Sequence, residues 1–132
     1  MQKIWFITGI SSGLGKALAE TVIAKGDFVI GTFRNDIQVQ EFNRMYQGKA
    51  LGLQMDVTKP QDIEQAFALI KKDFGKLDVL VNNAGIGFAG AIEEASIEEA
   101  KNIFEVNVFG ALKVTQEALP IFRKQGFGHI FQ

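Results

Sequence analysis

Residues 8–15 read Thr8-Gly9-Ile10-Ser11-Ser12-Gly13-Leu14-Gly15, and this stretch joins an apolar run to a segment with helical spacing of apolar residues. The run Lys3–Thr8 predicts a buried strand. The segment after the glycines predicts an amphipathic helix ending near Gly26, with an apolar face made of Leu14, Leu18, Ala19, Val22 and Ile23. Glycines permit a tight turn, and a helix start offers unpaired N–H groups and the positive end of the helix dipole. This order is typical of a pyrophosphate-binding turn, although a plain strand-to-helix connection has the same pattern.

Short β-rich runs alternate with helical segments along the rest of the chain. Further strands are expected at Phe28–Phe33, Ala50–Met55, Val79–Val81 and from His129 onward. Helices are expected at Asp36–Tyr46, from Pro60 to Phe74 and from Ile97 to about Lys124. Asp36 is expected to cap the first of these, and Ser96 with Glu99 predicts a capping box on the last. The alternation predicts one α/β domain over residues 1–132, a doubly wound parallel sheet of Rossmann type with strand order 3-2-1-4-5.

The composition argues against several classes of protein. The 132 residues carry a net charge of -1, so no strong field attracts nucleic acid or an anionic membrane. There is no Cys and one His, His129, which excludes disulfides, thiol nucleophiles and a His- or Cys-rich metal site. The apolar run after Met1 is too short for a signal-peptide core or a membrane span. We expect a cytoplasmic protein without nucleic-acid, membrane or metal partners, and its apolar residues, twelve of them Phe, give ample material for a core.

The stretch TGISSGLG resembles the T-G-x-x-x-G-x-G turn of the classical short-chain dehydrogenases/reductases. Three further features match that family at its spacing. Asp56-Val57 follows the third expected strand, Asn82-Asn83-Ala84-Gly85 follows the fourth, and Asn107 lies in the long helix. The resemblance covers the whole chain in order. It implies an NAD(P)-dependent oxidoreductase that transfers hydride between a carbonyl and an alcohol.

The resemblance assigns cofactor binding to three segments. In the glycine turn the binding positions are Thr8, Gly9, Ser11, Ser12, Gly13, Leu14 and Gly15. Asp56 and Val57 would line the adenine pocket, although a simple turn ahead of Pro60 is the alternative for these residues. Asn83, Ala84 and Gly85 would form the wall beside the cofactor ribose, while Asn82 would tie neighbouring strands together.

The choice between NAD(H) and NADP(H) depends on the end of the second strand. NAD-preferring Rossmann domains place an acid there, whereas an Arg suits the 2′-phosphate of NADP. Here Thr32 is expected at the position of the acid and Arg34 follows it, which favours NADP(H). Asp36 is the counter-argument, and we interpret it as a helix cap. A solvated surface charge is the alternative for Arg34.

Asn107 is the one member of the family's Asn-Ser-Tyr-Lys catalytic set within these 132 residues. By the resemblance it perturbs the long helix and holds a water of a proton relay; a locally capped Asn at a helix kink is the alternative. The only Tyr, Tyr46, has no Lys four residues later, and the sequence ends at Gln132, just short of the expected Ser. We therefore expect a truncated domain without strands six and seven that is inactive by itself. A non-catalytic dinucleotide-binding or regulatory module and a degenerate remnant are the other hypotheses.

The long helix also carries apolar residues on a face that packs against a partner subunit in the family: Phe104, Val108, Leu112 and Leu119. A truncated sheet would in addition expose the edge of its fifth strand. We expect a homo-oligomer formed through the long helix around Asn107 and through that open edge.

Overall fold

The computed structural model describes residues 1–132 and contains one parallel sheet with the order β3-β2-β1-β4-β5. The strands are β1 (Ile4–Ile7), β2 (Phe28–Phe33), β3 (Ala50–Gln54), β4 (Val79–Val81) and β5 (His129–Phe131). In register, Phe6 lies between Ile30 of β2 and Leu80 of β4. The predicted α/β class and strand order are confirmed.

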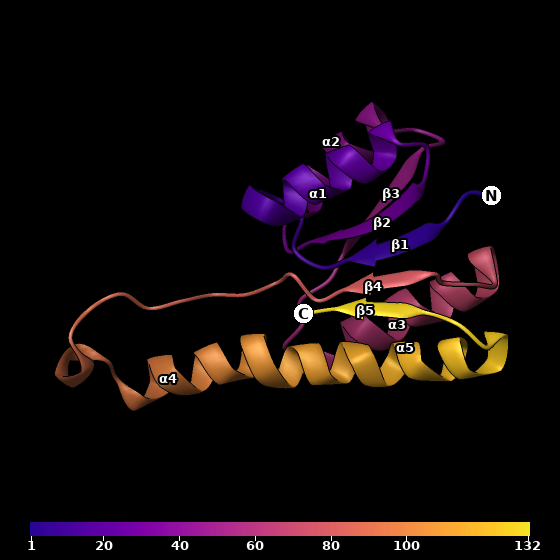
Figure 1. Ribbon diagram of the computed structural model, residues 1–132. Helices are drawn as coiled ribbons and strands as arrows, with labels where there is room; N and C mark the ends of the chain where they lie inside the picture. The colour runs from indigo at the N-terminus through magenta and orange to yellow at the C-terminus, as the bar shows by residue number, and fades with distance from the viewer.

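Helices cover both faces of the sheet (Figure 1). On one face lie α1 (Gly13–Ala24) and α2 (Asp36–Met45). On the other face lie α3 (Pro60–Leu69), which continues into the π-helical turn η1 (Ile70–Phe74), and α5 (Ala111–Gln125). This layering follows from right-handed crossovers between parallel strands.

Each side of the sheet has its own apolar core. Phe6, Ile30 and Leu80 point to the α3 and α5 side, where they pack with Phe67 and Val114. Their neighbours along the strands pack on the α1 and α2 side, in a cluster that includes Ile7, Val29, Val81, Ala19, Val22 and Val39. Because both faces are covered, the central strands are apolar without alternation, as the continuous runs in the sequence indicate.

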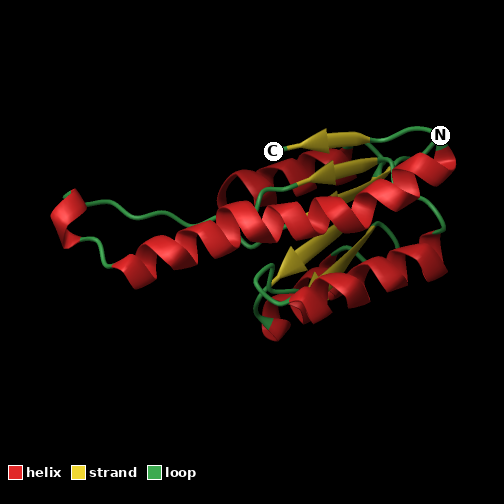
Figure 2. Cartoon of the chain, turned by 90° about the horizontal axis from the view of Figure 1, so that it is seen from below, coloured by secondary structure: helices red, strands yellow, loops and turns green.

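The connection from β4 to α5 extends beyond the sheet. After β4 the chain runs outward to the short 3-10 turn η2 (Ile92–Glu94) and returns as α4 (Ile97–Phe104), the π-helical turn η3 (Glu105–Gly110) and α5 (Figures 1 and 2). The capping box is present, because Ser96 Oγ accepts from Glu99 N–H and the Glu99 carboxylate accepts from Ser96 N–H. No helix combines the length and apolar composition needed to cross a bilayer.

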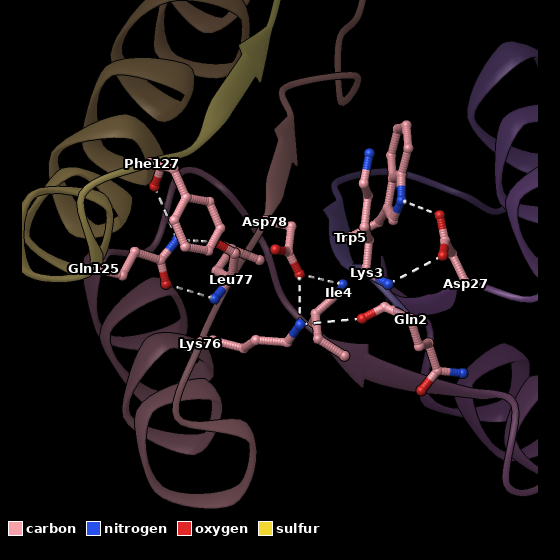
Figure 3. Close-up of polar contacts among 10 residues, drawn as sticks. All are labelled: Gln2, Lys3, Ile4, Trp5, Asp27, Lys76, Leu77, Asp78, Gln125 and Phe127. Atoms are coloured by element: carbon pink, nitrogen blue, oxygen red, sulfur yellow. Dashed lines mark hydrogen bonds and ion pairs between the residues drawn. The ribbon is translucent and has the colours of Figure 1, made fainter.

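Side-chain hydrogen bonds fasten the amino ends of the central strands (Figure 3). Asp78 Oδ2 accepts from Ile4 N–H at 2.7 Å and lies 3.2 Å from Lys76 Nζ. Asp27 accepts from Lys3 N–H at 3.0 Å and from the Trp5 indole N–H at 3.1 Å. The start of β1 is thus tied to carboxylates that precede its two neighbouring strands, β2 and β4.

Two sequence-based expectations about individual side chains are wrong. Leu14 is 85 % exposed, because it lies in the first turn of α1, outside the face that packs on the sheet. Asp36 does not cap α2: Asn35 Oδ1 accepts from Ile37 N–H and Gln38 N–H, and Asp36 is the first helical residue. Four Phe residues are buried, which are Phe6, Phe33, Phe67 and Phe122, and Phe28, Phe42 and Phe74 pack partly buried against the two cores.

Candidate functional site

A cavity of about 270 Å³ lies at the carboxyl ends of β1, β2, β3 and β4. This edge is where open α/β sheets bind their ligands, because the loops after parallel strands meet there. The loops after these strands, the end of β2 and the helical turn η3 contribute the lining residues, which are Gly9, Ser11, Ser12, Thr32, Phe33, Arg34, Met55, Asp56, Val57, Asn83, Ala84, Gly85, Ile86 and Val106.

The glycine turn offers a row of backbone donors at the start of α1. The N–H groups of residues 11–15 have no hydrogen-bond partner within the protein; the first bond of the helix start is Lys16 N–H to Ser12 C=O. Ser12 is the N-cap residue, and its side chain makes no capping bond. The positive end of the α1 dipole lies at the same place, so the turn is suited to an anion such as a pyrophosphate.

Two glycines of the turn are required by close contacts. Gly9 has φ +68°, and a Cβ there would lie 2.9 Å from Ala84 Cα. A Cβ at Gly15 would collide with Asn83 Nδ2 and Gly9 O. The turn and the loop after β4 therefore pack directly against each other, backbone on backbone, and leave the cavity beside them.

Partly buried hydrogen bonds fix this contact. Thr8, 1 % exposed, accepts at Oγ1 from Asn83 N–H at 3.0 Å and from Ala84 N–H at 2.9 Å. Asn83 Nδ2 donates in return to Thr8 O at 3.1 Å and to Gly9 O at 2.8 Å. Thr8 thus connects the turn to the NNAG loop and does not itself line the cavity.

The end of β2 presents Phe33 and Arg34 to the cavity. The hydroxyl of Thr32, which the sequence predicts at the acid's position, accepts a hydrogen bond from Gly9 N–H at 3.0 Å. Asp36 lies outside the cavity lining, and its carboxylate accepts from Gln40 Nε2 at 2.7 Å. The charged side chain at this end of the lining is therefore Arg34, accompanied by Asp56 from the next loop.

Asp56 makes a strand-end turn and also lines the cavity. Its Oδ1 accepts from Thr58 N–H at 2.9 Å and from Thr58 Oγ1 at 2.7 Å, which makes the predicted strand-end turn. The residue nevertheless lines the cavity. Burial raises the pKa of Asp56, but the Thr58 hydrogen bonds and the charges of Lys59 and Arg34 outweigh burial and hold the pKa below its ordinary value. The carboxylate is therefore an ionised acceptor at neutral pH.

Asn107 lies inside the π-helical turn η3, in the middle of the long helix. Its Oδ1 accepts from Ile86 N–H at 2.8 Å and its Nδ2 donates to Ile86 O at 2.7 Å. This pair of bonds holds the loop after Gly85 against the helix. Asn107 does not line the cavity. Its partner Ile86 and its neighbour in the chain, Val106, do line it.

Comparison with known proteins agrees with this arrangement. The sequence profile of the family described as short chain dehydrogenase matches residues 3–132. The chain belongs to the short-chain dehydrogenase family. Members of this family are oxidoreductases with a fold made for a dinucleotide cofactor.

Individual relatives in the short-chain dehydrogenase family are similar over nearly the whole chain. An oxidoreductase of Botryotinia fuckeliana is 39 % identical over 133 residues, which cover 100 % of this chain and 48 % of that protein. The NADPH-dependent 3-dehydrocapnine reductase of Ornithobacterium rhinotracheale is 40 % identical over 115 residues, or 86 % of this chain and 41 % of that protein. The crystal structure of a short-chain dehydrogenase from Streptomyces avermitilis superposes with a TM-score of 0.92 and 39 % identity, covering 98 % of this chain and 48 % of that chain. The chain spans about half the length of the relatives it matches.

The structure brings members of all the sequence-predicted cofactor segments to one cavity. Thr8, Gly13, Leu14 and Gly15 are the predicted binding residues that do not line it. Sequence reasoning missed four lining residues, which are Phe33, Met55, Ile86 and Val106. Each of these is the immediate neighbour of a residue that the short-chain dehydrogenase motifs single out, so adjacency to a motif is the signal that could have found them.

Proposed function

We propose that the chain binds NADP(H), in preference to NAD(H), for a short-chain dehydrogenase that interconverts a carbonyl and an alcohol. The observation that carries the proposal is Arg34 in the cavity lining at the end of β2, where the nearest acid of that loop, Asp36, is turned to Gln40. A guanidinium binds a phosphate through paired N–H donors, whereas an acid at this place would repel the 2′-phosphate. The NADPH-dependent 3-dehydrocapnine reductase among the relatives supports the same choice.

The residues of the cavity fit the parts of this cofactor in order. We assign the pyrophosphate to the free N–H groups of residues 11–15, the adenine to the side of Asp56 and Val57, and the ribose wall to Ala84 and Gly85. Bound NADP(H) would supply or accept the hydride. In this scheme Asn107 holds Ile86 in place and takes the family's relay position beside the reacting groups.

Protonation of the substrate is a separate requirement. A proton donor has to reach the carbonyl oxygen, and the lining of the cavity contains no Tyr, Lys or His. Relatives of the chain are about twice its length, and we propose that turnover belongs to the whole protein and that these 132 residues alone are inactive. The alternative is a non-catalytic module that binds a dinucleotide for regulation. Oxidation of NADPH by the whole protein with simple ketones separates the two functions.

Titration with the cofactors tests the preference. NADPH and NADH fluorescence should give tighter binding for NADPH, and Arg34→Ala should weaken NADPH about tenfold or more by removing a charged hydrogen-bond donor from the phosphate. NADH binding should be unchanged. Arg44→Ala, on the exposed last turn of α2, is the matched control. An equal loss for NADPH and NADH in Arg34→Ala would refute the 2′-phosphate assignment.

We further propose that the protein forms a homo-oligomer and works in the cytoplasm. Phe104, Val108 and Leu112 are 56 %, 46 % and 50 % exposed along the long helix, which supports a contact with a second copy. Leu119 is partly buried and contributes little to this surface. The exposed Phe131 on β5 supports the second contact, at the edge of the sheet.

A further inference from the structure

Thr32 is one of the two buried polar residues of the chain, the other being Thr8. It is 2 % exposed and lies one residue before the end of β2. Its hydroxyl accepts from Gly9 N–H at 3.0 Å, and its backbone carbonyl accepts from Ile10 N–H at 3.0 Å. Thr32 therefore accepts hydrogen bonds from two successive N–H groups of the glycine turn.

These two bonds divide the donors of the turn into two sets. The N–H groups of Gly9 and Ile10 point back to β2, and those of residues 11–15 are left without protein partners at the start of α1. The carbonyl bond is available to any residue at position 32, but the hydroxyl bond needs a side-chain acceptor. Gly9 already has φ +68° and lies against Ala84, so its N–H has little freedom to find another partner.

We infer that Thr32 is a positioning residue for pyrophosphate binding, which acts through Gly9 and not by contact with the ribose hydroxyls. This inference rests on the proposed dinucleotide function. Valine has the shape of threonine without the acceptor, so Thr32→Val leaves the Gly9 N–H unpaired in a partly buried place. The turn then has to shift to reach water, and the N–H groups of residues 11–15 shift with it. NADP(H) and NAD(H) share the pyrophosphate and lose affinity together.

The test compares three ligands on Thr32→Val and Thr32→Ser. Thr32→Val should weaken NADPH and NADH by the same factor, about tenfold, while Thr32→Ser, which keeps the acceptor, should bind both like the wild type. Adenosine 2′-monophosphate, which has the 2′-phosphate and lacks the pyrophosphate, should bind all three proteins equally. Thr21→Val is the matched control, because the exposed Thr21 hydroxyl bonds only to Ala17 O of its own helix.

Three outcomes overturn the inference: Thr32→Val binds NADPH like the wild type, Thr32→Ser is as weak as Thr32→Val, or adenosine 2′-monophosphate is weakened by the same factor as NADPH. The last outcome is the one a general loss of structure would give. Thr32→Cys has a weaker acceptor, so its affinity for NADPH and NADH should lie between those of Thr32→Ser and Thr32→Val. It replaces Thr32→Val in the comparison if that variant does not fold. Failure of the dinucleotide function has a different signature, since the wild type would then bind neither NADPH nor NADH.

Discussion

Asp27 shows how a single carboxylate secures the start of the central strand. It accepts hydrogen bonds from Lys3 N–H and from the indole of Trp5, the only Trp in the chain (Figure 3). The bond from the Lys3 backbone lowers the pKa of Asp27; burial opposes this, and the Trp5 bond and the nearby positive charges add to the lowering. The pKa in the folded protein is therefore below the value of a free aspartate.

This direction predicts a loss of stability in acid. A group with a depressed pKa in the folded state stabilises fully above its unfolded pKa, about 4, and the contribution disappears as the pH falls through the folded pKa. Asp27→Asn should lower the free energy of unfolding by on the order of 1 kcal/mol at neutral pH, with the difference from the wild type vanishing in acid. Urea unfolding followed by Trp5 fluorescence measures this difference in the free energy of unfolding, and Asp73→Asn is the control. A difference that persists below pH 3 would contradict the assignment.

At the scale of single residues, the sequence predicted which residues belong to the candidate site better than it predicted where their side chains point. The motif residues Gly9, Asp56 and Asn83 do line the cavity. Phe33 lines the cavity beside Thr32, which depends on the pleat and twist of β2 that no local pattern states. Asn35 and Asp36 are equally good N-cap types, and the backbone of the loop decides between them.

The long helix holds β4 and its flanks through three side chains. Asn107 bonds to Ile86 beyond the strand, Thr115 Oγ1 accepts from Asn82 Nδ2 at its end, and Gln125 pairs with the backbone of Leu77 before it (Figure 3 shows the Gln125 end). The helix runs antiparallel to the strand, so its polar residues meet the strand in reverse order. The sequence predicted both elements and their lengths, but partners that are 21 and 48 residues apart depend on the path of the loops.

Removal of the bond pair at Asn107 should loosen one end of this attachment. Asn107→Leu should raise the hydrogen-exchange rate of the Ile86 amide and weaken NADPH about fivefold to tenfold, because Ile86 lines the cavity. The amide of Leu77, held by Gln125, should exchange as in the wild type. Asn102→Leu, on the exposed surface of α4, is the control. Unchanged exchange at Ile86 would show that the loop is held by other contacts.

At the scale of the whole molecule, the long helix has an apolar surface that the rest of the chain does not cover. Phe104, Val108 and Leu112 lie on the helix that projects past the sheet (Figure 2). A charge in this surface should prevent association through the helix, so Leu112→Glu should lower the mass found by light scattering at tens of micromolar. Ile37→Glu, equally apolar and 66 % exposed but on α2, should leave the mass unchanged. A wild-type protein that is monomeric at this concentration would refute the proposed oligomer.

The strand order has a consequence for how the chain forms as it is synthesised. β2 pairs with β1, β3 pairs with β2, and β4 and β5 then add in turn on the other side of β1. Every new strand joins an edge that already exists, and none has to insert between two others. A ribosome adding 5–20 residues per second needs about one to five seconds to pass from the end of β3 to β4. For that interval β1, the future centre of the sheet, is its exposed edge, and this is the moment when the nascent chain most needs protection from its neighbours.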